Sequence, residues 1–159
     1  MEMVSCVNGT LASWLFGNRS MPTLTWEQRM QISIGIAKGL WVFHKNPVEK
    51  MVHGNIKTTN ILLNEKLEAK IAGSISSNLK WKKMYGLEAN LEDVFSFGIV
   101  LMQILAGRNT RTLVGEARGA ILTGNVSSMA DPCLNGAYIQ SEFWNLLSIS
   151  VLLYLQKRT

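Results

Sequence analysis

Residues 52–63 constrain the fold more than any other part of the chain, because polar side chains at fixed spacing lead directly into an apolar run. The segment reads VHGNIKTTNILL. Residues 61–63 and 67–71 are short apolar strand candidates, and residues 64–66 between them suit a turn. The sequence therefore predicts a small β-hairpin, entered by a loop that carries His53, Asn55, Lys57 and Asn60.

The order of these polar residues resembles the catalytic loop of protein kinases, which reads His-Arg-Asp, then Lys two positions later and Asn three beyond it. Gly54 stands at the Arg position and Asn55 at the Asp position. In the family, that Asp accepts the substrate hydroxyl proton, the Lys neutralises developing charge and the Asn holds a magnesium ion. The resemblance implies a vestigial loop of His53, Asn55, Lys57 and Asn60, since an amide is no base at neutral pH. Loss of a positioned base costs about 10²–10⁴ in rate.

Two further positions extend the resemblance along the chain. Gly73 stands where the family has its metal-binding Asp, so the resemblance implies that no metal site remains. Asp93 begins a segment similar to the central helix of the larger kinase lobe, and its counterpart in the family bonds the backbone of the catalytic loop. Within the family, the chain resembles plant receptor-like kinases, and Lys57 fits their serine/threonine pattern.

The same resemblance implies a fold and its boundaries. Residues 3–11 resemble the segment that joins the two lobes, and no Gly-rich loop, ATP-binding Lys or partner Glu is found before it. The activation segment, between residues 73 and 93, is short, and residues 86–88 resemble a remnant of its last motif. We therefore expect a mainly α fold with a short β-hairpin. It would form one partial kinase-like domain over residues 1–159, an incomplete larger lobe without the smaller lobe and the final helix.

Local signals predict two helices in the first third of the chain. A short helix is expected over residues 11–16, and a long one from a capping box at Thr25 and Gln28 to the stop at Pro47. The long helix is apolar on most sides, so both of its stripes should be buried. These stripes are Ile32, Ile36, Leu40 and Phe43 on one side, and Met30, Ile34, Ala37, Trp41 and His44 on the other. His44 is expected to act only in packing.

Three more helices are predicted towards the C-terminus. The first covers about residues 91–106, with Asp93 in its first turn, and the second is a weaker stretch over residues 113–122. Ser141 is expected to cap the third. Its predicted core face consists of Phe143, Leu147 and Tyr154.

Composition excludes several classes of protein. The chain has 159 residues, 47% of them apolar and 17% charged, which suits one folded domain and argues against disorder. Cys6 and Cys133 have no metal-like spacing and are expected to be free thiols. A net charge of +5 is the only feature that favours nucleic acid, so no nucleic-acid partner is expected. No apolar run reaches the ~20 residues of a membrane span, and no secretory signal is evident, so the cytoplasm is the expected location.

Three functional hypotheses remain open from the sequence. The first is an inactive kinase-like (pseudokinase) module that needs no cofactor, binds a protein partner such as an intact receptor-like kinase, and reaches a membrane only through that partner. The second is a serine/threonine kinase that binds ATP and magnesium and phosphorylates proteins. The third is a truncated product without a function. The basic segment 80–83 is either a docking patch for anionic groups or, as we favour, a solvated loop.

Overall fold

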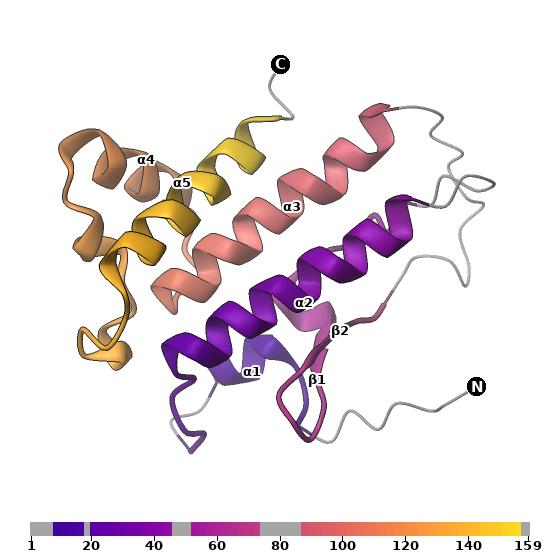
Figure 1. The fold of residues 1–159 in the computed structure, drawn as a ribbon, viewed down its shortest axis with the longest axis horizontal. Helices are drawn as coiled ribbons and strands as arrows, with labels where there is room; N and C mark the ends of the chain where they lie inside the picture. The colour runs from indigo at the N-terminus through magenta and orange to yellow at the C-terminus, as the bar shows by residue number, and fades with distance from the viewer. Residues whose placement is uncertain (1–7, 18–19, 46–51, 74–86, 157–159) are drawn as a thin grey trace.

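The computed structural model describes residues 8–17, 20–45, 52–73 and 87–156. The described chain forms a helical body with one small hairpin (Figure 1). Its α-helices are α1 (Leu11–Phe16), α2 (Trp26–His44), α3 (Leu87–Ala106), α4 (Leu113–Thr123) and α5 (Gln140–Leu155). Strands β1 (Ile61–Leu63) and β2 (Ala69–Ile71) form the hairpin, and short 3₁₀ turns are η1 (Thr58–Asn60), η3 (Val126–Met129) and η4 (Pro132–Leu134). The predicted fold class, mainly α with a short hairpin, is confirmed.

Helix α2 begins at the predicted capping box. The Gln28 amide donates to Thr25 Oγ1 at 3.2 Å, and the Thr25 amide donates to Gln28 Oε1 at 2.9 Å, so two exposed backbone donors are satisfied reciprocally. Ile32, Ile36 and Leu40 are buried as expected. The prediction that the second stripe is also buried holds only at its ends: Met30 and His44 are partly buried, whereas Ile34, Ala37 and Trp41 are exposed. Ile34 is 40% exposed and Trp41 is 63% exposed.

The hairpin is antiparallel, with Leu62 opposite Lys70. Strand β2 begins two residues later than predicted, since Leu67 has a φ of 58° and belongs to the turn. The segment just before α1 lies along the other edge of β1: the Asn8 amide donates to the Leu63 carbonyl at 3.2 Å, and the Leu63 amide donates to the Gly9 carbonyl at 2.9 Å. This pairing fixes the start of the described chain against the hairpin.

Helix α3 lies between α2 and α5 (Figure 1) and contributes to both hydrophobic clusters. Its buried Met102 and Leu105 pack with α4 and α5, whereas Val100 and Ile104 pack with α1, α2 and β1. The helix begins at Leu87 instead of about residue 91, so Asp93 lies in its second turn and the predicted first-turn position is wrong.

Helix α4 starts at the predicted residue, Leu113, and α5 starts earlier than predicted. Phe143 and Leu147 are buried as expected, and Tyr154 is partly buried against the same cluster. Ser141 does not cap α5: the helix already starts at Gln140, and the cap position, Ile139, has no side-chain hydrogen bond. Within the described ranges, no helix is long and apolar enough to cross a bilayer. Residues 3–7 of the expected hinge segment (residues 3–11) and the basic residues 80–83 lie outside the described residues.

A buried arginine connects three parts of this body. The Arg29 guanidinium donates to the carbonyls of Leu24 at 3.0 Å and Ile104 at 2.8 Å, and to Asp131 Oδ2 at 2.8 Å. Asp131 Oδ1 accepts the Cys133 amide at 2.9 Å and so caps η4. Gly107, which ends α3, has a φ of +65°, and a Cβ there would lie 2.1 Å from Asp131 Oδ2. The start of α2, the end of α3 and η4 are therefore held by one ion pair.

We expect Arg29→Ala to destabilise the protein by about 3–5 kcal/mol, because it leaves the buried Asp131 carboxylate without its counter-ion. Urea unfolding at neutral pH measures the loss. Arg108→Ala is the matched control, since the Arg108–Glu116 pair is partly exposed and should contribute far less. Equal losses for the two variants would contradict a special role for Arg29.

Candidate functional site

Asp93 of α3 binds the backbone of the loop that enters the hairpin. Asp93 Oδ2 accepts the His53 amide at 2.8 Å, and Oδ1 accepts the Gly54 amide at 2.9 Å. His44, at the end of α2, places its Nε2 2.9 Å from Oδ2. The carboxylate is almost fully buried, so its charge is compensated by these donors. One side chain thus fixes the loop to two helices.

The surroundings of Asp93 favour its charged form. Burial by itself raises the pKa of this carboxyl, but the hydrogen bond from His44, the amides of Gly54 and His53 and the charge of His44 together bring the pKa below its ordinary value. The sequence analysis assigned His44 to packing alone, and this was incomplete. Its polar role has no signal in the periodicity of α2, because the partner lies in α3.

His53 is a buried link between the loop and the segment after β2. Its Nδ1 accepts the Asn55 amide at 3.2 Å, so the ring proton of the neutral form lies on Nε2 and is donated to the Ala72 carbonyl at 2.8 Å. The ring also contacts the edge of Phe43, with centroids 6.0 Å apart. These contacts use both ring nitrogens, and His53 therefore positions the loop.

Asn60 connects the loop to the position where the family carries a metal-binding Asp. Its Nδ2 donates to the Asn55 carbonyl at 2.9 Å, and its own carbonyl accepts the Ala72 amide at 2.8 Å. Gly73 has a φ of +65°, and a Cβ there would lie 2.6 Å from Asn60 Oδ1. The space next to Gly73 is thus filled by the Asn60 amide, and a side chain at position 73 would have to displace it.

The structure brings His53, Asn55, Asn60, Gly73 and Asp93 together. Lys57 lies on the same loop, just before η1, with an exposed side chain. At the two positions that carry carboxylates in the family, the loop presents the neutral amide of Asn55 and the bare backbone of Gly73. Among the described residues, no group of three or more His, Cys, Asp and Glu is placed to hold a metal ion.

We expect Asp93→Asn to destabilise the protein by about 1–3 kcal/mol at pH 7, because the new amide turns a donor towards the buried amides of His53 or Gly54. The folded-state pKa of Asp93 lies below the ~3.9 of an unfolded chain. Its contribution is therefore complete above about pH 5 and is lost as the pH falls through 4 towards the folded pKa. Urea unfolding of both proteins between pH 7 and 3 should show the difference shrinking, and a constant difference would contradict this.

A side chain at position 73 should lower the stability of the protein by more than the left-handed backbone conformation alone explains. Gly124 has a similar φ of +74°, but a Cβ there meets nothing within 4 Å. Gly124→Ala should lose only the ~1–2 kcal/mol of the left-handed conformation. Gly73→Ala should lose about 1 kcal/mol more, since the Asn60 bond to Asn55 must break. Thermal unfolding of both variants measures the two losses, and equal losses would mean that Asn60 moves aside freely.

Comparison with known proteins agrees with this geometry. The family model for protein tyrosine and serine/threonine kinases matches residues 1–91. Among curated proteins, a probable LRR receptor-like serine/threonine-protein kinase of Arabidopsis thaliana is 33% identical over 91% of the chain, and a putative proline-rich receptor-like protein kinase of the same plant is 32% identical over 88%. The chain spans only about a fifth to a quarter of the length of these relatives, 20% and 24% respectively. With the family model matching more than half of its residues, the chain belongs to the protein tyrosine and serine/threonine kinase family.

Proposed function

We propose that this chain is a catalytically inactive, kinase-like module that acts by binding a protein partner. The observation that carries the proposal is the filled space beside Gly73, where the Asn60 amide lies 2.6 Å from the place of a Cβ. A carboxylate at this position is the main magnesium ligand in the family. Asn55, at the position of the proton acceptor, removes the other carboxylate.

The site keeps the side chains that support the loop and lacks the two carboxylates that act in the chemistry of the family. Asp93 and His53 use buried hydrogen bonds to hold the loop in place. Magnesium is a hard cation that prefers charged oxygen ligands. The oxygen nearest to a Cβ at Gly73 is the neutral Oδ1 of Asn60, and a neutral amide does not fit a family-type magnesium site. A retained framework without its reactive groups supports a role in binding rather than in phosphoryl transfer.

The proposed partner is an intact receptor-like kinase, and the proposed location of binding is the cytoplasm. This choice follows from the relatives, whose names describe receptor-like kinases. Any association with a membrane would then come through the partner. The module would need neither ATP nor magnesium, and nucleic acid is not a proposed partner.

A serine/threonine kinase is the second candidate, because Lys57 and Asn60 keep their family positions and the relatives are described as kinases. Under this alternative, the chain would bind ATP and magnesium and phosphorylate a protein hydroxyl. The two candidates differ in a measurable property, which is nucleotide binding.

We expect the thermal midpoint of the purified chain to be unchanged by magnesium and ATP. A ligand at about 100 times its dissociation constant stabilises by ~2.7 kcal/mol, which would raise the midpoint of a domain of this size by several degrees. Differential scanning fluorimetry measures the midpoint, and γ-labelled ATP with a general protein substrate measures transfer.

The matched variants are Asn55→Asp alone and Asn55→Asp combined with Gly73→Asp. The single variant restores a proton acceptor without the metal ligand and should stay inactive. The double variant restores both carboxylates but, as for Gly73→Ala, should be less stable than the parent. A nucleotide-dependent shift or label transfer by the unmodified chain would overturn the proposal and favour the kinase.

A further inference from the structure

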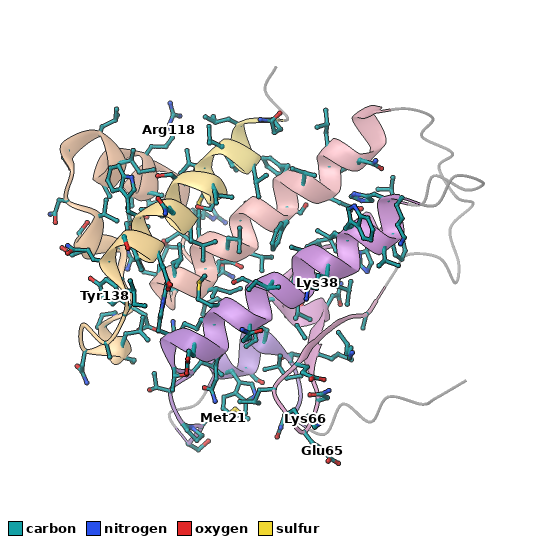
Figure 2. All side chains as sticks on the ribbon, in the orientation of Figure 1. Met21, Lys38, Glu65, Lys66, Arg118 and Tyr138 are labelled. Carbon is teal, nitrogen blue, oxygen red and sulfur yellow. The ribbon has the colours of Figure 1, made fainter. Side chains whose placement is uncertain are left out.

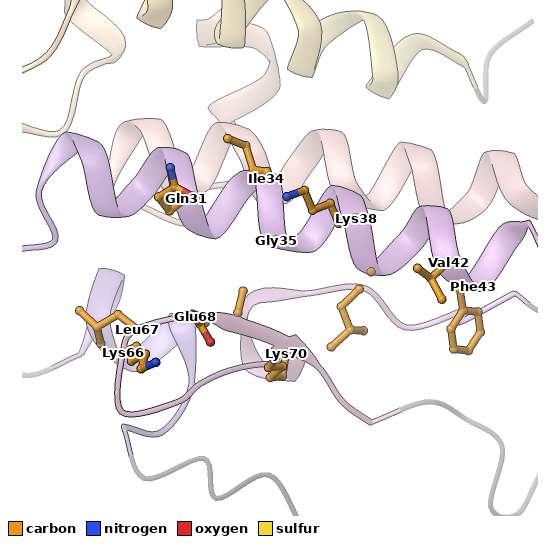
Figure 3. Close-up of a pocket in the computed structure, with 13 residues that line it drawn as sticks. Gln31, Ile34, Gly35, Lys38, Val42, Phe43, Lys66, Leu67, Glu68 and Lys70 are labelled. Atoms are coloured by element: carbon orange, nitrogen blue, oxygen red, sulfur yellow. The ribbon is translucent and has the colours of Figure 1, made fainter. Parts of the chain in front are cut away.

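An open groove of about 770 Å³ runs along the junction of α2 and the hairpin (Figure 3). One wall is the α2 face from Gln31 to Phe43, and the other is the turn and second strand of the hairpin, residues 66–71. The groove borders β2. The segment before α1 instead pairs with β1, at the other edge of the hairpin. None of residues 52–60, the loop that enters the hairpin, lines the groove.

Two glycines of α2 that line the groove face β2. A Cβ at Gly35 would lie 3.5 Å from the Ala69 Cβ, and one at Gly39 would lie 2.9 Å from Ile71 Cδ1. The strand therefore approaches the helix backbone closely at these two positions. This shape leaves a channel between helix and hairpin that is open to solvent.

The helix wall carries exposed apolar side chains. Ile34 and Val42 are 40% and 57% exposed, and they lie two helical turns apart on the face of Lys38. Ile34 belongs to the stripe that the sequence pattern assigned to the core. Exposed apolar side chains in a groove with a polar rim are typical of a binding surface.

The rim of the groove is positively charged. Lys38 of α2 and Lys66 and Lys70 of the hairpin are exposed, and all three line the groove. The ion pairs found among the described residues involve other side chains. The one carboxylate in the lining, Glu68, accepts a hydrogen bond from Asn64 Nδ2 at 2.8 Å within the turn. Lysines thus outnumber carboxylates along the groove.

We propose that this groove binds an extended segment of a partner protein in which apolar residues alternate with Asp or Glu. The apolar side chains would lie against Ile34 and Val42, and the carboxylates would face Lys38 and Lys66. The α2 wall from Gln31 to Phe43 is about 18 Å long at ~1.5 Å per residue, which matches about five residues of extended chain. The inference rests on the proposed binding function and names the chemistry that this module recognises.

The test is fluorescence anisotropy with a labelled mixture of short peptides in which Leu or Val alternates with Asp or Glu. A second mixture, with Lys in place of the acidic residues, is the charge control. The full chain is compared with Lys38→Glu combined with Lys66→Glu, and with Arg118→Glu, a charge reversal on exposed α4 far from the groove (Figure 2). Thermal melts establish that the variants are folded.

We expect the acidic mixture to bind and the basic mixture not to bind. The double reversal should weaken binding about tenfold or more, because it replaces attraction with repulsion, and added salt should weaken binding to the parent chain. Arg118→Glu should change affinity less than about twofold.

Three results would overturn the inference: no binding of the acidic mixture, equal binding of both mixtures, or equal loss in the groove and α4 variants. Self-association of the chain that the double reversal abolishes would instead assign the groove to a second copy and would also overturn it. Phosphoryl transfer by the parent chain would refute the proposed inactivity without changing the anisotropy result, so the two failures are distinguishable.

Discussion

The buried guanidinium of Arg29 is the interaction on which the described body most depends. It joins the start of α2, the last turn of α3 and the cap of η4 through the Leu24 and Ile104 carbonyls and the Asp131 carboxylate. A charge of this kind is tolerable in a core only when every donor finds an acceptor. The arrangement fixes one end of α3, while Asp93 fixes the loop to the same helix three turns earlier. The geometry of the candidate site therefore depends on the packing of α3.

This dependence explains why the loop keeps a kinase-like form without the kinase carboxylates. The contacts that shape it are buried and use Asp93, His53 and the backbone of Asn55. Changes at Asn55 and Gly73 leave those contacts intact, since neither side chain takes part in them. Once position 73 is glycine, the Asn60 amide fills the adjoining space and bonds to the loop itself. The framework and the reactive groups are thus physically separable.

The exposed face of α2 connects the fold with the proposed binding role. A helix that is apolar all round is expected to be buried, yet only the side that carries Ile32, Ile36 and Leu40 is fully buried. The other side leaves Ile34 and Val42 open next to lysines of the hairpin. Exposed apolar side chains beside positive charge offer this family member a binding surface that needs no nucleotide.

Local sequence determined much of this protein. The Thr25–Gln28 capping box, the apolar runs of the helices and the hairpin with its turn were predictable because each depends on neighbours within a few residues. The motif order likewise placed His53, Asn55, Lys57, Asn60, Gly73 and Asp93 in one functional region. Tertiary structure alone decided which face of α2 is covered, where α3 and α5 begin, that His44 bonds Asp93, and that Asn60 occupies the space beside Gly73. These features join residues far apart in the chain, and no local periodicity reports which distant side chain will fill a given space.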